Sequence, residues 1–191
     1  MGVIKLNPEQ IDFLNYNYPN LNYDLVNNVI KGTLSFNLKF KNQGEVIIDE
    51  YQIEIDLNNV SDLGIPKVRE TEGRIFEIAS KKNKSSSDLH LNSINGEMCI
   101  IIPPKAKERY PNGFDLKILL EHLEEHLYWV SFFEKFDKEP WMSYGHGEIG
   151  YLQLLLENKE KYTFDFKKYF NCQSRADYRK KIKELKKKYK L

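Results

Sequence analysis

The chain has 191 residues, of which 41% are hydrophobic and 13% aromatic, and it carries a net charge of +1. This length and composition predict one folded domain and exclude a disordered chain. No apolar run approaches the roughly 20 residues needed to cross a bilayer, and the segment "MGVIKLNPEQ" lacks the apolar core of a secretion signal. Two cysteines far apart in a lysine-rich chain fit a reducing compartment, so we expect a cytoplasmic protein with no membrane partner.

The first half of the chain predicts a short helix followed by an antiparallel sheet. Asn7 is a typical helix N-cap, and Pro8 suits the first helical position. Three segments in which apolar and polar residues alternate follow, at residues 28–42, 45–57 and 65–80. With turn residues such as "NQG" between them, these segments predict a meander of about four strands with one face exposed to solvent.

The second half of the chain changes to a helical period. Prolines interrupt the segment "IIIPPKAKERYPNG", which we expect to be irregular. From Phe114 to about Phe136, apolar residues recur at helical spacing, namely Leu116, Leu119, Leu120, Leu123, Leu127 and Val130. Another helix is expected in "EIGYLQLLLENKEKY", residues 148–162, after a glycine loop, so the complete pattern predicts an α+β fold.

The C-terminal residues 167–191 carry eleven Lys or Arg against two acidic residues, whereas the rest of the chain has a net charge of −8. An apolar stripe along this segment, formed by Tyr178, Ile182, Leu185 and Tyr189, predicts an amphipathic helix. We expect this basic extension to form one compact unit with residues 1–166, or to meet an acidic partner. It lacks further interleaved aromatics for stacking on bases, so nucleic acid is not the expected partner.

The segment "DLHLNSINGEMCIII", residues 88–102, contains the pattern H-x-N-x-x-x-G-x-x-C, formed by His90, Asn92, Gly96 and Cys99. It follows the predicted meander and precedes the predicted helices. This pattern and order of elements, over about residues 10–155, resemble the ubiquitin-conjugating (UBC) family. The similarity points in particular to bacterial members encoded in CBASS antiphage systems and ubiquitin-like conjugation operons. Leu91 stands where the eukaryotic signature has proline, and the cysteine is one residue nearer the asparagine.

The resemblance implies a UBC-like conjugating domain at residues 1–166, with no cofactor and no metal. Cys99 would hold the C-terminus of a partner protein as a thioester, Asn92 would stabilise the oxyanion of the transfer step, and His90 would shape the loop, with Gly96 in support. The implied partner is a ubiquitin-like protein or a cyclic-oligonucleotide synthase. No adenylating domain is recognisable in this chain, so a separate activating enzyme would load Cys99, unless the protein acts directly on its partner.

Thiol chemistry agrees with this interpretation, because a thiolate is both a good nucleophile and a good leaving group. The rival interpretation is a catalytically silent binding scaffold of the same fold. In that case Cys99, which adjoins the apolar run "MCIII", is a small buried hydrophobic residue. Exposure of the thiol to a reagent under native conditions distinguishes the two.

The segment "HLEEH" offers a second enzymatic alternative. His122, Glu125 and His126 have the H-x-x-E-H spacing of one class of zinc peptidase, with both histidines on one helix face. The same face carries apolar residues, and no third ligand is evident. A zinc peptidase therefore remains an alternative rather than the main hypothesis.

Two further motifs match known binding patterns only in part. The segment "GHGEIG" matches a dinucleotide-binding fingerprint but lacks the preceding buried strand, so we expect a turn in which His146 could approach the active site. The segment around Cys172 resembles a short cysteine-rich zinc-binding tail in which only one ligand, Cys172, remains. A zinc site needs several ligands, so we expect no metal there.

Overall fold

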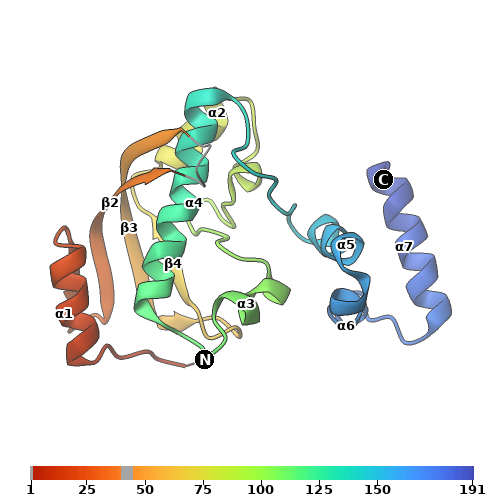
Figure 1. Ribbon diagram of the computed structural model, residues 1–191, viewed down its shortest axis with the longest axis horizontal. Coiled ribbons are helices and arrows are strands. Elements are labelled where there is room, and N and C mark those ends of the chain that lie inside the picture. The colour runs from red at the N-terminus through yellow and green to blue at the C-terminus, as the bar shows by residue number, and fades with distance from the viewer. Residues whose placement is uncertain (1, 40–44) are drawn as a thin grey trace. The chain divides into compact units, whose positions relative to one another are not determined.

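In a computed structural model that describes residues 2–39 and 45–191, the chain divides into two compact units, Met1–Trp141 and Met142–Leu191 (Figure 1). The first unit contains all the strands among the described residues, and the second is helical. The expected boundary between residues 166 and 167 falls instead inside a helix, α6 (Lys159–Tyr169). The basic extension therefore belongs with residues 142–166 to the second unit.

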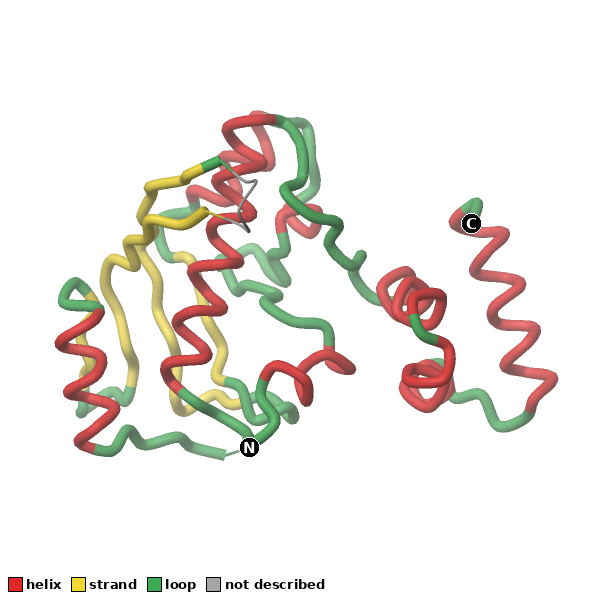
Figure 2. Tube along the Cα trace, viewed as in Figure 1, coloured by secondary structure: helices red, strands yellow, loops and turns green. Residues whose placement is uncertain are grey.

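The strands of the first unit form one antiparallel sheet in the order β1-β2-β3-β4 (Figure 2). Their bounds are β1 Leu21–Asp24, β2 Val29–Lys39, β3 Val46–Val60 and β4 Pro66–Glu70. Each strand pairs with the next in sequence, which confirms the predicted meander of four strands. The expected "NQG" turn lies in residues 40–44, outside the described residues.

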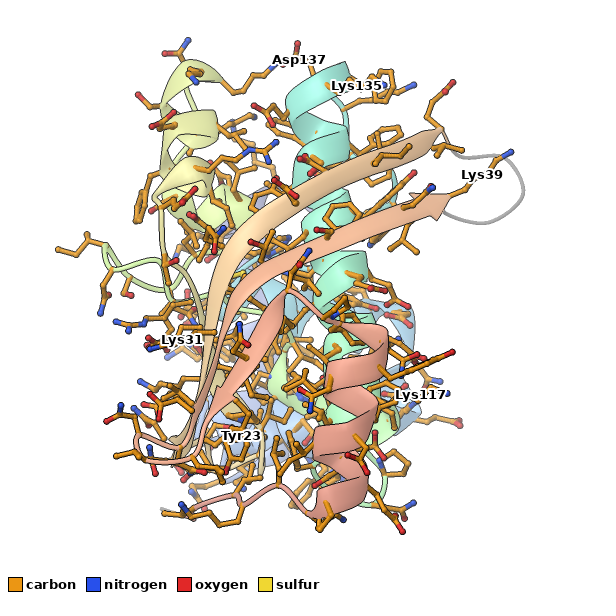
Figure 3. All side chains as sticks on the ribbon, turned by 90° about the vertical axis from the view of Figure 1, so that its left-hand side faces the viewer. Tyr23, Lys31, Lys39, Lys117, Lys135 and Asp137 are labelled. Carbon is orange, nitrogen blue, oxygen red and sulfur yellow. The ribbon has the colours of Figure 1, made fainter. Side chains whose placement is uncertain are left out.

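The helices of the first unit include the two that local patterns predict most directly. Helix α1 (Pro8–Asn17) begins at Asn7, whose side chain accepts a hydrogen bond from the Gln10 backbone N–H at 2.8 Å. The Gln10 side chain accepts from the Asn7 N–H in return, which completes a capping box. Helix α4 (Leu116–Phe136) contacts β2 and β3 and buries the whole predicted leucine stripe. Figure 3 shows it running behind these strands from Lys117 to Lys135.

Two short helices replace segments that were predicted otherwise. Residues 74–80 were expected to continue a strand, but β4 ends at Glu70 and α2 (Arg74–Lys81) follows. Gly73 turns the chain with φ 78°, and the buried Ile75, Ile78 and Ala79 then follow a helical rather than a two-residue period. The segment expected to be irregular contains α3 (Pro103–Arg109). Its two prolines lie in the first turn, where backbone N–H groups have no partner within the helix, so the missing N–H groups of proline cost no helical hydrogen bond.

The second unit contains α5 (Glu148–Glu157), α6 and α7 (Arg175–Tyr189). Its own apolar core consists of Leu152, Leu155, Phe166, Tyr178 and Leu185. Helix α7 has the predicted amphipathic character, since its apolar stripe is in this core and most of its basic residues are exposed. Among the described residues, no helix is long and apolar enough to cross a membrane.

Candidate active site

Residues 90–99 form a narrow antiparallel hairpin, called here the Cys99 hairpin. The Cys99 N–H donates to the His90 carbonyl at 2.7 Å, and the Asn92 N–H donates to the Glu97 carbonyl at 2.7 Å. Leu91 and Met98 pair between these two positions, and both side chains are buried in the core. Because successive side chains of an extended chain point to opposite sides, Asn92, Glu97 and Cys99 are directed away from that core.

The Cys99 hairpin is fastened to the free edge of β4. The Met98 N–H donates to the Val68 carbonyl at 2.9 Å, and the Glu70 N–H donates to the Gly96 carbonyl at 3.0 Å. Gly96 has φ 78°, and a Cβ added there would overlap the Glu70 carbonyl oxygen. Only glycine therefore allows this close approach of the two backbones. Gly96 thus allows the hairpin to approach β4, and its supporting role in the active-site loop stays a prediction.

Cys99 and Asn92 line the same cavity, which has a volume of about 160 Å³ and is called here the Cys99 cavity. Its lining comes from the β3–β4 turn, from β4 and from the Cys99 hairpin with the residues just after it: Ser61, Leu63, Ile65, Pro66, Lys67, Val68, Asn92, Glu97, Met98, Cys99, Ile100 and Ile101. Asn92 is exposed and Cys99 is partly buried. The fold thus brings the predicted nucleophile and the predicted oxyanion donor to one place.

His90 is the first residue of the Cys99 hairpin, but its ring points toward α4 and does not line the Cys99 cavity. Its backbone adopts the left-handed conformation, φ 60° and ψ 37°, and ends a short 3-10 helix, η2 (Ser86–Leu89). The ring meets Trp129 of α4 edge-on, with 5.0 Å between centroids, and lies 5.5 Å from the His126 ring. His90 therefore anchors the loop on α4 through its ring while its carbonyl holds the Cys99 N–H, a geometry that suits positioning rather than proton transfer.

The surroundings of Cys99 favour its neutral thiol over the thiolate. Burial raises the thiol's pKa above its ordinary value, and the nearby Glu97 carboxylate raises it further. Glu97 in turn forms an ion pair with Lys67, with 3.1 Å between Nζ and Oε2. Sequence reasoning missed both charged residues. The two-residue spacing from Glu97 to Cys99 is the signal that could have identified the first, because it puts both on one side of an extended segment.

The residues of the zinc alternative are engaged in other contacts. The His122 Nδ1 lies 2.9 Å from the Tyr110 hydroxyl, and burial followed by the charge of Arg109 lowers the pKa of His122 to about 4. Glu125 pairs with Arg109 at 3.1 Å. Within residues 2–39 and 45–191, no group of three His, Cys, Asp or Glu side chains is placed to hold a metal ion. His122 and His126 thus gain no third ligand in this part of the chain, and we do not propose a zinc site.

The remaining predicted residues belong to the second unit. His146 precedes α5, and the expectation that it approaches Cys99 stays a prediction. Cys172 lies between α6 and α7, where its side chain packs against the apolar core of that unit.

No family model, curated protein or solved structure matches the chain. The resemblance to the ubiquitin-conjugating family therefore rests on the residues and the order of elements described above.

Proposed function

We propose that this protein is an acyl carrier of the ubiquitin-conjugating type, which holds the C-terminus of a partner protein as a thioester on Cys99 and transfers it to an amine. The observation that supports this most directly is the shared cavity of Cys99 and Asn92. Two backbone hydrogen bonds across the hairpin, at Cys99 and at Asn92, hold the two residues in a defined register.

Loading of the carrier exchanges one thioester for another. The Cys99 thiolate attacks the carbonyl carbon of a donor thioester, and the Asn92 amide donates a hydrogen bond to the oxyanion that forms. The new C–S bond to Cys99 remains, the C–S bond to the donor breaks, and the departing thiolate takes up the proton that Cys99 lost. An activating enzyme supplies this donor in the pathway that the family resemblance implies.

Transfer uses the same cavity in a second step. The acceptor amine attacks the thioester carbon, the C–N bond forms, and the C–S bond to Cys99 breaks. The proton lost by the amine restores the Cys99 thiol. In both steps negative charge develops on the same carbonyl oxygen, so a single donor such as Asn92 serves both.

The raised pKa of Cys99 suits a carrier better than a hydrolase. A thiolate of high pKa is intrinsically more nucleophilic, although less of it is present at neutral pH, and it is a poorer leaving group. A thioester on such a thiol therefore resists attack until an acceptor amine and an oxyanion donor are both in place. Burial and the Glu97 charge contribute to this resistance.

The same pKa also favours a second candidate, the catalytically silent scaffold. Burial and the Glu97 charge both raise the thiol's pKa, and the side chain is partly buried. A scaffold would bind a partner but would form no covalent adduct. The two candidates therefore differ in one measurable product.

The test is co-expression with the neighbouring genes followed by a non-reducing gel of wild type, Cys99→Ser and Cys172→Ser. We expect a wild-type adduct that reducing agent removes, an adduct of Cys99→Ser that resists it as an oxyester, and no change for Cys172→Ser. Mass spectrometry of the adduct identifies the donor, expected to be a ubiquitin-like protein or a cyclic-oligonucleotide synthase. Absence of any adduct, with Cys99 also unreactive toward a thiol reagent, would leave the scaffold as the function.

A further inference from the structure

We infer that the exposed basic side of α7 is a docking surface for the phosphate backbone of a nucleic-acid duplex. This surface, called here the basic face, consists of Arg175, Arg179, Lys180, Lys183, Lys186 and Lys187. Docking at this surface involves the second unit and does not depend on thioester chemistry at Cys99. It differs from the expectation drawn from the sequence, which set nucleic acid aside because stacking on unpaired bases requires exposed aromatic side chains.

The net charge of the whole chain conceals a strongly basic second unit. Residues 142–191 contain thirteen Lys or Arg against six Asp or Glu, a net charge of +7, whereas residues 1–141 have a net charge of −6. A unit with a strong charge of one sign attracts ligands of the opposite sign over a distance and raises their association rate. The second unit is therefore suited to a polyanion.

The basic face forms one uninterrupted sector of α7. At about 100° per residue its members fall within about 140° of the helix circumference, and the other α7 position in that sector is Ala176. Five of the six side chains are exposed, and Lys186 is partly buried. From Arg175 to Lys187 the face extends about 18 Å along the helix axis. Helix α7 thus presents a continuous row of cations.

The acidic residues of α7 lie outside this sector and have other partners. Asp177 accepts hydrogen bonds from the Ser174 N–H at 2.9 Å and from the Ser174 hydroxyl at 2.8 Å. Glu184 forms an ion pair with Lys181 at 3.7 Å. Within the part of the chain that the structure describes, no carboxylate forms an ion pair with a member of the basic face. An anionic partner therefore does not have to displace a carboxylate of this chain.

The apolar side of α7 holds the basic face in place. The apolar stripe packs in the core of the second unit, where Tyr178 and Leu185 are buried. Near the end of the helix, the Lys188 Nζ lies 2.7 Å from the Glu148 Oε2 of α5. The cations are thus arranged before any partner binds, which lowers the entropic cost of binding. The same packing leaves no apolar stripe for insertion into a lipid surface, which interfacial helices require.

The composition of the basic face favours a duplex over other polyanions. It contains four lysines and two arginines and no exposed aromatic side chain. Single strands bind by stacking their bases on exposed aromatics, and interfaces between folded proteins are depleted in lysine. A duplex needs neither feature, because its affinity comes from the release of counterions condensed on closely spaced phosphates. Over about 18 Å of its axis a duplex presents about ten phosphate charges, enough to engage the whole face.

Fluorescence anisotropy of the full chain with short labelled duplexes tests this surface. DNA and RNA duplexes of the same sequence are titrated at salt concentrations between about 50 and 200 mM NaCl. We expect a Kd of about 1–100 µM at about 150 mM NaCl, and a slope of about −4 in a plot of log affinity against log salt. The duplex that binds more tightly identifies the source of the phosphates.

A matched pair of variants locates the binding. Lys183→Gln/Lys187→Gln removes two charges from the basic face and should weaken duplex binding about tenfold, with a salt slope shallower by about 2. Lys117→Gln/Lys159→Gln removes the same charge from exposed lysines in the first turns of α4 and α6, and should leave both quantities unchanged. Glutamine and lysine have similar helix propensities, so both variants should fold, which circular dichroism checks.

Three results of these titrations would overturn the inference: no binding of either duplex in this salt range, an affinity that does not change with salt, or equal weakening in the two variants. Further probes represent the other polyanions, namely a single strand of the same sequence, a glutamate-rich peptide of equal charge and vesicles that contain phosphatidylserine. Tighter binding of any of these than of the duplex would also overturn it and would name the partner instead. None of these outcomes changes the adduct on the non-reducing gel, so the thioester function stands or falls separately.

Discussion

Cys99 and Cys172 are both partly exposed thiols, but their surroundings differ in what they leave accessible. Cys99 lies on a hairpin whose backbone is hydrogen-bonded internally and to β4, and its side chain lines a cavity. Cys172 lies between two helices, packs against an apolar core, and directs its Sγ toward the Phe170 carbonyl at 3.9 Å. Burial raises the pKa of both thiols, so titration alone does not distinguish them.

This comparison shows that a site is made by the neighbours of a thiol more than by the thiol itself. Cys99 has an amide donor in the same cavity and a fixed backbone register. The charges near Cys172 are Asp177, which raises its pKa, and Lys181 and Lys167, which lower it.

The largest effect is expected from removal of the oxyanion donor. Asn92→Ala should slow transfer of the acyl group from Cys99 to an amine by about 100- to 1000-fold, the usual cost of losing one such donor. Single-turnover decay of the preloaded thioester in the presence of an amine measures this rate. Asn95→Ala is the matched control, because Asn95 is exposed in the turn of the same hairpin and does not line the cavity. Equal rates for both variants would remove Asn92 from the mechanism.

The next effect concerns the attachment of the hairpin to β4. Gly96→Ala should lower the free energy of unfolding by about 2–5 kcal/mol, because it combines a left-handed alanine with an overlap against the Glu70 carbonyl. Gly113→Ala shares the positive φ but meets no atom within 4 Å, so its cost should be about 1–2 kcal/mol. Denaturant titration compares the two, and indistinguishable midpoints would contradict the close approach.

A smaller effect is expected from Glu97. The carboxylate raises the pKa of Cys99, so Glu97→Gln should lower that pKa and increase the thiolate fraction at neutral pH. Alkylation of Cys99 by iodoacetamide at pH 7.5 should then become severalfold faster, and its pH profile should move to lower pH. Cys172 in the same sample is the internal control, since Glu97 is not among the charges that shift its pKa. A profile that stays in place would show that burial alone sets the pKa of Cys99.

The smallest effect belongs to the second cysteine. Cys172→Ser should leave thioester formation on Cys99 unchanged, because Cys172 belongs to the second unit and lines no part of the Cys99 cavity. Its expected cost to stability is about 1 kcal/mol, from placing a hydroxyl group against an apolar core. Quantitative mass spectrometry of the acylated peptide measures the first quantity, and a fall in Cys99 adduct would contradict the comparison.

The elements that could be predicted from the sequence are those decided by local chemistry. The Asn7 capping box, the alternation of β3 and the leucine stripe of α4 each depend on residues within a few positions of one another. The segment that begins at Arg74 is different, because it was included in a predicted strand although its buried residues Ile75, Ile78 and Ala79 have helical spacing. The turn at Gly73, whose φ is positive, separates it from β4, and that turn is not visible in the alternation of the preceding strand.

The candidate site could be predicted only in part for a related reason. The spacing from His90 to Cys99 suggested a loop with a nucleophile and an amide, and the structure places Asn92 and Cys99 at one cavity. Other lining residues of this cavity, Leu63 and Ile65, lie more than 30 positions before Cys99 in the chain. Their approach to Cys99 depends on pairing between β4 and the hairpin, and contacts of that sequence separation leave no local pattern.

The pairing of the Cys99 hairpin with β4 also protects the sheet from other chains. The Val68 carbonyl and the Glu70 N–H, which would otherwise form an open strand edge, are occupied by Met98 and Gly96. Exposed edges of this kind recruit strands from neighbouring molecules. Loosening of the hairpin should therefore cause concentration-dependent aggregation rather than reversible inactivation, so the same ten residues that form the candidate site also keep this edge from self-association.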